Sequence, residues 1–319
     1  RARQAGAIAP QKSKNYTLAL VLGFLVPLLF LLIRDFFDNK IYEKRDVTEA
    51  VKFPVLGIIP HNKKGNRRDS GNLLVFDENR SPATEAFRAM RTSLQYFATQ
   101  KTNKVIAITS AVSEEGKTFS AINLASVLAI SGKRTVLLGC DLRKSSIHRD
   151  FGISKSPGLS NYLIGKSDLE DIIQKSGQSN YLDVIAGGPI PPNPSELIES
   201  ERMTELIGIL REKYDFTIID TSPVGIVPDG IHIIKNSDIA VYIVRQGFSD
   251  KSSLEFLNEF VEKIDAKNIC IEINDVKPGS SIYEYGYGYA YGNYGFEKGA
   301  KNKIAKRIKE VIRLLLRKG

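Results

Sequence analysis

The sequence predicts an α/β protein with a doubly wound, mostly parallel sheet and a phosphate-binding loop, preceded by one transmembrane helix. Three observations support this fold class. Near-continuous β-branched runs alternate with helical patterns, as in parallel sheets whose two faces are covered by helices. A Gly-Lys-Thr motif stands between one of these runs and a helical pattern. Eighteen consecutive uncharged residues precede the whole series.

Composition limits the possible functions. The 319 residues, 42% of them hydrophobic, can bury one large or two medium cores. Cys140 and Cys270 have no disulfide or zinc spacing, which favours a reducing compartment. Residues 298–319 hold nine Lys or Arg and one acid, so almost all of the net charge of +9 lies there and the globular part is not a basic nucleic-acid binder. The chain starts at Arg1 without a methionine, which indicates a fragment of a longer protein.

Residues 16–37 are expected to form the transmembrane helix. The uncharged run Tyr16–Ile33, extended by Phe36 and Phe37, reaches the roughly 20 residues that span a bilayer. A signal peptide and a buried core helix are the alternatives, but no small-residue cleavage site is evident and soluble helices are rarely apolar all round. Residues 1–15 are then an extracytoplasmic tail, because the flanking charges and the nucleotide motif downstream place the following residues in the cytoplasm.

Residues 38–80 are expected to form a cytoplasmic linker. It contains one strand candidate, Pro54–Pro60, and then a polar basic stretch that is typical of a loop. His61 opens that stretch without a partner at ligand spacing, so we expect it to be solvated.

The main domain is expected to span residues 81–280 and to begin with a helix capped by Ser81. Glu85, Arg88 and Arg91 recur at three-residue spacing and form a charged stripe along this helix. The stripe is either a solvated face or a subunit contact.

The nucleotide site is expected in the loop that links the strand 105–109 to a helical pattern. Backbone N–H groups and the helix N-terminus can cradle phosphates there, while Lys117 adds a positive charge and the Thr118 hydroxyl can ligate Mg²⁺. Ala111 stands where the first glycine of the motif is expected, so the loop is a variant. The residues predicted to bind ATP in this segment are Ala111, Ser113, Glu114, Glu115, Gly116, Lys117, Thr118 and Phe119.

Further strands are predicted at 135–139, 182–185, 216–220, 239–245 and 269–273, with helices at 195–212 and 251–264. Ligands bind at the carboxyl ends of such strands, where several polar residues fall. Asp220 is a candidate for directing Mg²⁺, and Asp141 is a candidate metal ligand or proton acceptor, although a strand-end Asp can also cap the next turn. Arg143 follows Asp141, Asn274 is placed to read an adenine edge, and Arg245 either does the same or pairs internally.

These residues resemble bacterial tyrosine autokinases, the ATP-dependent kinases fused to or paired with polysaccharide co-polymerase membrane proteins. The segments AVSEEGKT at 111–118, VLLGCDLRK at 136–144 and FTIIDTSP at 216–223 resemble the three nucleotide motifs of that family. The stripe of Glu85, Arg88 and Arg91 matches its Glu-x-x-Arg-x-x-Arg oligomerisation motif, which favours the subunit contact. PVLGIIP and GPIPPNPSEL are also similar, so the resemblance covers nearly the whole chain.

The resemblance implies ATP and Mg²⁺ as cofactors and a role in capsular or exopolysaccharide polymerisation and export. It implies a ring-forming homo-oligomer, with an octamer as the family's suggestion, in the bacterial inner (cytoplasmic) membrane with the kinase domain in the cytoplasm. It also implies a cognate tyrosine phosphatase, an outer-membrane polysaccharide export component and a preceding extracytoplasmic domain that this chain lacks.

One departure from the family concerns the second acidic motif. The family usually has Asp-x-Asp-x-Arg there, and Gly139 takes the place of the first Asp. Either Asp141 alone serves as base and in the metal shell, or activity is reduced.

Residues 281–297 form a tyrosine- and glycine-rich segment that cannot bury a core. An adhesive low-complexity tail is one interpretation, but beside a kinase site the hydroxyls are expected to be phosphate acceptors. We hypothesise that the unmodified tail docks in a neighbour's site and that phosphorylation expels it and loosens the ring. The predicted phosphorylation sites are Tyr283, Tyr285, Tyr287, Tyr289, Tyr291 and Tyr294.

Residues 298–319 have one apolar helical face and one basic face. Such a basic amphipathic helix can lie on anionic membrane lipid, pack on the kinase domain, or meet the phosphotyrosines of the tail.

The sequence therefore predicts a membrane-anchored protein-tyrosine autokinase of partition-ATPase-like fold that phosphorylates the tail of a neighbouring subunit. The catalytic residues are Lys117, Asp141 and Asp220, and the metal is directed by Thr118, Asp141 and Asp220.

Two alternatives stay open. A partition-type ATPase would hydrolyse ATP with water, but its distinguishing lysine is absent where Ser110 and Ala111 stand. A structural co-polymerase subunit would bind ATP only to assemble, which Gly139 leaves possible.

Overall fold

The structure, a computed structural model, describes residues 12–62, 72–78, 80–97, 104–227, 229–266, 268–280 and 282. The chain divides into two compact units, residues 1–40 and 41–319, each considered by itself. Residues 1–11, the predicted acceptor tyrosines and the predicted basic helix 298–319 lie outside the described residues.

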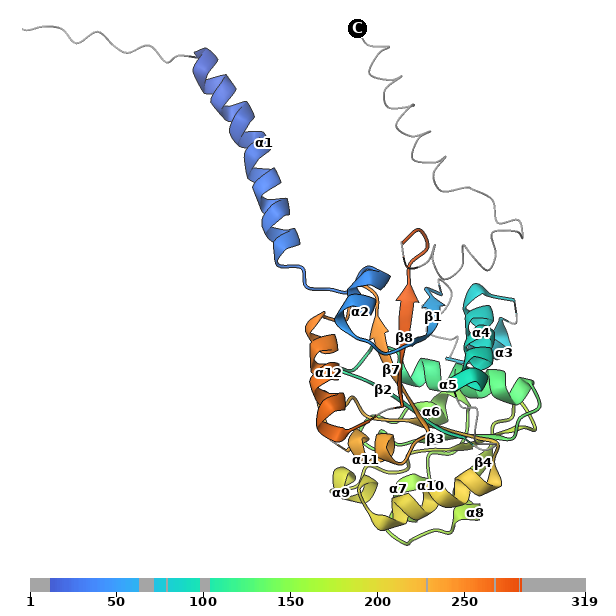
Figure 1. Ribbon diagram of the computed structural model, residues 1–319. Helices are drawn as coiled ribbons and strands as arrows, with labels where there is room; N and C mark the ends of the chain where they lie inside the picture. The colour runs from blue at the N-terminus through green and yellow to red at the C-terminus, as the bar shows by residue number, and fades with distance from the viewer. Residues whose placement is uncertain are drawn as a thin grey trace, which may run out of the picture. The chain divides into compact units, whose positions relative to one another are not determined.

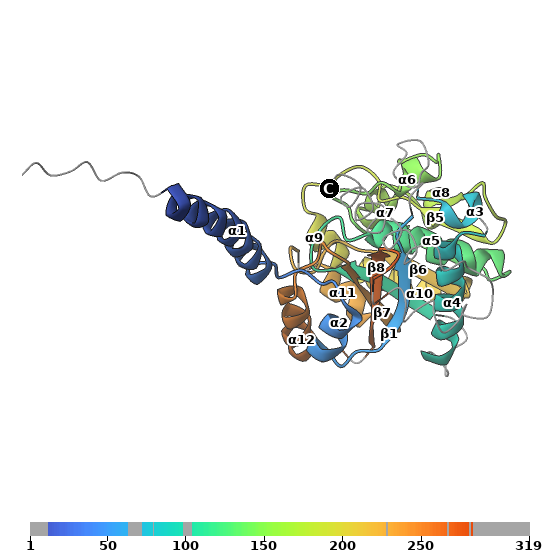
Figure 2. The ribbon, with the colours of Figure 1, turned by 90° about the horizontal axis from the view of Figure 1, so that it is seen from above.

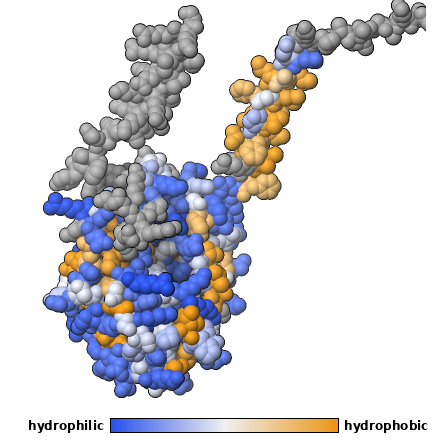
Figure 3. Space-filling model, turned by 180° about the vertical axis from the view of Figure 1, so that it is seen from behind, coloured by the Kyte–Doolittle hydropathy of each residue, from blue (hydrophilic) through white to orange (hydrophobic). Residues whose placement is uncertain are grey.

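The described part of the first unit is dominated by helix α1, Lys12–Phe36, which contains Pro27. Residues 14–33 have a mean hydropathy of 2.6, and the helix is long and apolar enough to cross a membrane. Its large side chains face outward, with Phe24 79% exposed, and Figure 3 shows this apolar surface in orange. A long helix whose exposed side chains are apolar all round has the character expected of a membrane span.

The second unit is built on an eight-stranded sheet in which only the pairing of β4 with β5 is antiparallel (Figure 1). The β-branched runs of the sequence form its strands, because both faces of the sheet are buried. In spatial order the strands are β1 (Val55–Pro60), β8 (Ile269–Val276), β7 (Ile239–Arg245), β2 (Lys104–Ser110), β6 (Phe216–Asp220), β3 (Thr135–Gly139), β5 (Leu182–Ile185) and β4 (Ile173–Lys175).

Helices cover both faces of the sheet, and alternate residues of each central strand supply two separate cores (Figure 2). In β2, Val105 and Ala107 face one core, while Ile106 and Ile108 face the other. The first core is completed by α2 (Lys44–Ala50), α7 (Leu159–Leu163), α8 (Leu169–Ile172), α9 (Pro194–Ile198), α10 (Glu201–Lys213), α11 (Gly230–Lys235) and α12 (Ser252–Ile264). The second is completed by α3 (Leu74–Asp77), α4 (Pro82–Phe97), α5 (Lys117–Ile130) and α6 (Ile147–Asp150).

The doubly wound, mostly parallel sheet is confirmed, and three local features differ from the sequence-based expectation. The antiparallel edge strand β4 was not predicted. The helix expected at 195–212 is two helices, because Ser200 is extended and its hydroxyl caps α10 by accepting from the Met203 N–H at 3.3 Å. The expected linker 38–80 contributes α2 and strand β1, which pairs with β8, so the second unit begins before residue 81.

Candidate functional site

The predicted nucleotide residues gather at the carboxyl edge of the sheet. The phosphate loop follows β2, Asp220 ends β6, and Asp141 lies just after β3. Since β2, β6 and β3 are consecutive neighbours, these groups stand in a row in that order. The parallel arrangement thus brings together residues that are far apart in the sequence.

The phosphate loop depends on a left-handed glycine at the start of α5. Gly116 has φ +102°, and a Cβ there would lie 2.0 Å from Asn274 Nδ2. Glu114 also has a positive φ, of 69°. Ala111 is not among the residues of positive φ and is buried, so alanine fits where the usual motif has glycine. The variant loop therefore needs no strained backbone at residue 111.

The buried side chain of Glu115 stabilises the phosphate loop through hydrogen bonds. Its side chain is fully buried, and one carboxylate oxygen accepts the Val112 N–H at 2.9 Å. The Ser249 hydroxyl donates to the other oxygen. A buried carboxylate with two donors fixes the loop backbone, so Glu115 lies behind the loop as a structural anchor.

Lys117 is only 7% exposed, and its Nζ donates to Ser110 Oγ at 3.0 Å and to the Val112 carbonyl at 3.2 Å. Burial lowers the pKa of Lys117, while the carboxylates of Asp220, Glu115 and Asp141 oppose this effect. The ammonium group is thereby directed to the loop and to the acidic strand ends.

Thr118 and Asp220 form the predicted metal-directing pair. The Thr118 hydroxyl donates to Asp220 Oδ2 at 2.7 Å. Burial raises the pKa of Asp220 to about 7, although the Thr118 hydroxyl and the charge of Lys117 act in the opposite direction. Among the described residues, the buried Oδ1 of Asp220 has no hydrogen-bond partner. A buried, unpaired carboxylate oxygen beside a hydroxyl suits a hydrated divalent cation.

Asp141 caps the turn that follows β3. Its Oδ1 accepts the backbone N–H groups of Arg143 at 3.1 Å and Lys144 at 2.9 Å, as in the alternative considered for a strand-end aspartate. The guanidinium of Arg143 donates to Asp229 at 2.8 Å and to Ser195 at 3.0 Å. The sequence therefore placed Arg143 at the correct edge of the sheet, but its side-chain partners are Ser195 of α9 and Asp229, which directly precedes α11.

Gly139, where the resembled family has an aspartate, pairs in register with Asp220 across β3 and β6. A Cβ at this position would lie 3.2 Å from both Ser145 Oγ and Ile147 Cδ1. The chain thus lacks a carboxylate directly beside Asp220, and a side chain there requires small shifts of its neighbours.

Arg245 and Asn274 contact the phosphate loop itself. Asn274 Nδ2 donates to the Glu115 carbonyl at 2.9 Å, and Arg245 Nη1 donates to the Glu114 carbonyl at 2.9 Å. Arg245 is also held by Asp275, with Nε to Oδ2 at 2.9 Å. Both side chains brace the loop from β7 and β8. For Arg245 this is the internal pairing that the sequence left open, whereas for Asn274 the sequence suggested contact with an adenine edge.

Three polar residues of this network were missed from the sequence. Asp275 accepts from Arg245, Ser249 contacts Glu115, and His61 lies 2.5 Å from Asp275, so the expectation of a solvated His61 is wrong. His61 directly follows β1, whereas Asp275 lies within β8 and Ser249 in the loop after β7. Their contacts were not predictable from local sequence, because the partners lie up to 214 residues away.

The remaining predicted residues lie in the phosphate loop, at the start of α5 or on α4. The ring of Phe119 packs against Phe87 of α4, with centroids 5.8 Å apart, while Ser113 is half-buried in the loop. On α4, Arg88 pairs with Glu85, and Arg91 Nη1 donates to the Val127 carbonyl of α5 at 3.4 Å. Within the described ranges, no group of three or more His, Cys, Asp or Glu side chains could hold a metal by itself.

Comparisons with known proteins agree with this geometry. Residues 103–273 match the AAA domain family. The tyrosine-protein kinase wzc of Salmonella typhi is 30% identical over 315 residues, which cover 94% of this chain and 42% of the relative. The tyrosine-protein kinase etk of Escherichia coli K12 is 30% identical over 300 residues, 88% of this chain and 41% of the relative. The chain thus spans about two fifths of the length of these curated relatives.

Two solved structures are similar over most of the chain. The kinase domain of Escherichia coli tyrosine kinase ETK has a TM-score of 0.69 and 31% identity, covering 74% of this chain and 95% of that one. The chimerical protein CapA2B2 has a TM-score of 0.65 and 34% identity, covering 72% and 98%. Because the family match extends over more than half of the chain and the ETK kinase domain is covered almost in full, the chain belongs to the AAA-domain family and, within it, to the bacterial tyrosine kinases.

Proposed function

We propose that this chain is an ATP-dependent protein-tyrosine autokinase that phosphorylates the tyrosine-rich tail of a neighbouring subunit. The observation that carries the proposal is the row formed by the phosphate loop, the Thr118–Asp220 pair and Asp141 along one edge of the sheet. The row supplies a phosphate cradle, a metal-directing pair and a proton acceptor in the order that phosphoryl transfer to a hydroxyl requires.

ATP would be held by the backbone N–H groups of the loop and by Lys117, at the N-terminus of α5. Thr118 and Asp220 would hold Mg²⁺, Asp220 through water, and their hydrogen bond and the unpaired Asp220 Oδ1 support this assignment. Bound there, the ion would neutralise charge on the β- and γ-phosphates.

Asp141 would accept the proton of the attacking tyrosine hydroxyl. One of its oxygens accepts two backbone N–H groups, which fixes the orientation of the carboxylate toward the edge of the sheet. Little covalent chemistry is needed beyond positioning, so a single carboxylate suffices for the reaction although Gly139 removes the second.

The similarity to curated tyrosine-protein kinases supports a proposal about the wider role. We propose that the chain acts in the polymerisation and export of a capsular polysaccharide or exopolysaccharide, joined to a co-polymerase segment and anchored by α1 in the bacterial inner membrane with the kinase unit in the cytoplasm. The homo-oligomeric ring, with Glu85, Arg88 and Arg91 at the contact, belongs to the same proposal. So do the phosphatase, the export component and the contact of residues 298–319 with membrane lipid.

Intact-mass measurement after incubation with Mg-ATP tests the kinase activity. We expect steps of about 80 Da, the mass of one added phosphoryl group, that map to Tyr283–Tyr294. The steps should disappear in Lys117→Met and persist in Lys133→Met, since Lys133 is exposed and remote from the loop.

A second candidate function, ATP binding for assembly only, is favoured by Gly139 alone. It predicts bound ATP without any mass step in the wild-type chain. In that case Gly139→Asp, which places a carboxylate beside Asp220, would be expected to restore the mass steps.

A further inference from the structure

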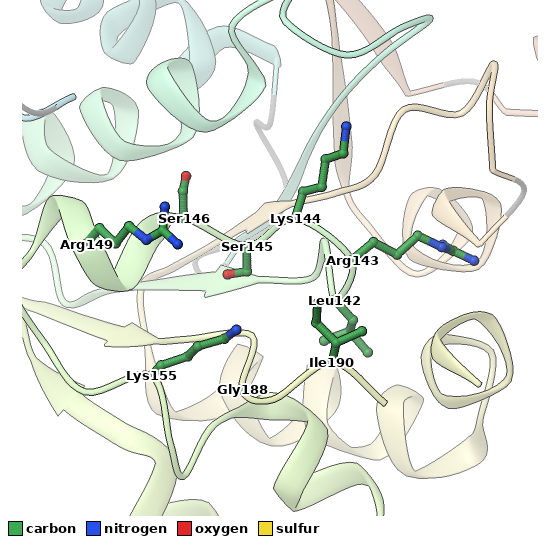
Figure 4. A pocket seen from close by; sticks show the side chains of 9 residues that line it. All are labelled: Leu142, Arg143, Lys144, Ser145, Ser146, Arg149, Lys155, Gly188 and Ile190. Atoms are coloured by element: carbon green, nitrogen blue, oxygen red, sulfur yellow. The ribbon is translucent and has the colours of Figure 1, made fainter. Parts of the chain in front are cut away.

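A basic cavity of about 270 Å³ adjoins the proposed active site on the side away from the phosphate loop. It lies at the ends of β3 and β5, where the loop after Asp141 and the loop after β5 face each other (Figure 4). Its lining residues are Leu142, Arg143, Lys144, Ser145, Ser146, Arg149, Lys155, Gly188 and Ile190, none of them acidic.

Most of the cationic side chains that line this cavity have no ion pair among the described residues. Arg143 is paired with Asp229, but Lys144, Arg149 and Lys155 form no ion pair with the carboxylates that the structure describes. Arg149 and Lys155 are close enough to act together on His148, whose pKa is lowered chiefly by burial and then by these two charges. Figure 4 shows Ser145 between Arg149 and Lys155. Two cations and a hydroxyl around one small space suit a dianionic phosphate.

The Ser145 hydroxyl provides a second indication of a ligand. It is buried and has no hydrogen-bond partner among the described residues. Buried hydroxyls without a partner are uncommon, and an anion bound between Arg149 and Lys155 would accept a hydrogen bond from the Ser145 hydroxyl.

The position of the cavity suggests which phosphate it binds. Along the carboxyl edge, the neighbouring strands β2, β6, β3 and β5 carry the phosphate loop, Asp220, Asp141 and the cavity, in that order. An acceptor hydroxyl at Asp141 therefore has the nucleotide on one side and the basic cavity on the other. A segment that passes over Asp141 extends into the cavity.

The tail sequence matches this arrangement. Tyr283, Tyr285, Tyr287, Tyr289 and Tyr291 occupy every second position. In an extended chain, alternate residues point to the same side and are about 6.6 Å apart. A tyrosine at Asp141 and its alternate neighbour can thus face the enzyme on the same side of the tail.

We propose that the cavity binds the phosphate of a tail tyrosine that has already reacted, and so presents the next alternate tyrosine to Asp141. The inference rests on the proposed kinase function. In each reaction cycle the tyrosine oxygen forms a bond to the γ-phosphorus of ATP. The bond between this phosphorus and the β–γ bridging oxygen breaks. ADP leaves, and the hydroxyl proton passes to Asp141. The first phosphate then primes the second, and modification proceeds along the tail in steps of two residues.

Peptide binding without ATP tests the cavity independently of catalysis. The protein is the full chain with its six tail tyrosines changed to phenylalanine, and the probes are labelled peptides of residues 281–297, unmodified or phosphorylated at Tyr287. We expect fluorescence anisotropy to show at least about tenfold tighter binding of the phosphopeptide, corresponding to about 1.4 kcal/mol. This preference should be lost in Arg149→Gln/Lys155→Gln.

The matched control is Lys166→Gln/Lys213→Gln, which removes the same charge from exposed positions outside the cavity and should keep the preference. Equal affinity for the two peptides, or a preference that survives in the cavity variant, overturns the proposal. Inorganic phosphate is tested alongside, and the proposal also fails if free phosphate binds the cavity as tightly as the phosphopeptide does.

Adding Mg-ATP gives the second measurement. The primed peptide should gain its next phosphate several-fold faster than the unmodified peptide at low peptide concentration, and the cavity variant should modify both at the same rate. If the protein with an unchanged cavity phosphorylates neither peptide, the proposed kinase function fails. The anisotropy result still decides what the cavity binds.

Discussion

Asn274 uses its side-chain amide to support the backbone of the phosphate loop. Its Nδ2 donates to the Glu115 carbonyl, and its Oδ1 accepts the Asp275 N–H at 2.8 Å. Both polar atoms of the side chain are therefore engaged with the protein. A Cβ at Gly116 would collide with this amide, so loop and asparagine are fitted to each other.

We predict that Asn274→Ala weakens ATP and GTP binding by the same factor, roughly 3- to 10-fold, because one loop-holding hydrogen bond is lost. Titration calorimetry with both nucleotides measures it. Asn258→Ala serves as control, since Asn258 donates to the Ala50 carbonyl and not to the phosphate loop. A loss confined to ATP would instead show that Asn274 reads the adenine.

Glu272 is a second buried carboxyl group, beneath the phosphate-loop helix. It is 0% exposed, and the Ser120 hydroxyl of α5 donates to its Oε1, while Oε2 has no partner among the described residues. Burial raises the pKa of Glu272 to about 7, from 4.5. The folded state therefore binds this proton more tightly than the unfolded state does. Its contribution to stability is complete below about pH 4.5 and is lost as the pH rises to about 7.

We predict that Glu272→Gln, which cannot ionise, raises Tm by roughly 5 °C at about pH 8 and has little effect at about pH 4.5. Thermal unfolding across this range measures the difference between variant and wild type. The exposed glutamate Glu255, changed to Gln, is the control and should leave the pH dependence unaltered. A Tm difference that does not depend on pH would contradict a buried neutral carboxyl at 272.

At the scale of elements, the strands could be predicted because their apolar runs are continuous. The expected bounds of β3, β5, β6 and β7 match the structure residue for residue. Edge strand β4 could not be predicted, since its sequence Ile-Gln-Lys has neither apolar continuity nor a clear period. The break before α10 was missed because Ser200 interrupts an otherwise continuous helical pattern with a single cap.

In the candidate site, too, some residues could be predicted from local sequence and others could not. Lys117, Thr118 and Asp220 could be predicted because motif spacing and strand ends specify them locally. The supports of the loop could not, because the folded sheet alone brings Ser249 to Glu115, 134 residues away, and His61 to Asp275. Arg143 illustrates the limit most clearly. Its position at the edge of the sheet was predicted correctly, but the orientation of its side chain depends on hydrogen bonds to Asp229 and Ser195.

Helix α4 carries the charged stripe proposed as a subunit contact. The side chains of Arg88 and Glu85 pair within the helix and are 30% and 34% exposed, so they can contribute to a contact without supporting the core. We predict that Arg88→Glu, which sets two like charges one turn apart, reduces the oligomer to smaller species with a Tm change below about 2 °C.

Light scattering after size-exclusion chromatography measures this mass. Arg45→Glu makes the same charge change on α2, where Arg45 is 70% exposed, and should keep the wild-type mass. An unchanged mass for Arg88→Glu would remove α4 from the proposed contact.

At the scale of the whole molecule, the two units differ in how much apolar side-chain surface they expose. Among described residues, the large apolar side chains of α1 are about half or more exposed, whereas those of the second unit lie mostly in two cores on the faces of its sheet. Exposed apolar side chains over 20 residues are costly in water and favourable in a bilayer. A membrane anchor would also confine tails and active sites to the same surface, which raises the local concentration of acceptor tyrosines.

We predict that Leu25→Arg/Leu29→Arg moves the protein from the membrane pellet to the soluble fraction after an alkaline wash. Two arginines near the centre of a span cost roughly 5–7 kcal/mol on the insertion scale, and both leucines lie on one face of α1. Ile209→Arg/Ile226→Arg places the same charges on exposed isoleucines of the second unit and should leave the protein in the pellet. If the wild-type chain itself stays soluble, α1 is not an anchor. If the leucine variant is soluble and still gains tail phosphates as fast as wild type at equal bulk concentration, anchoring serves location alone and not the encounter between tail and site.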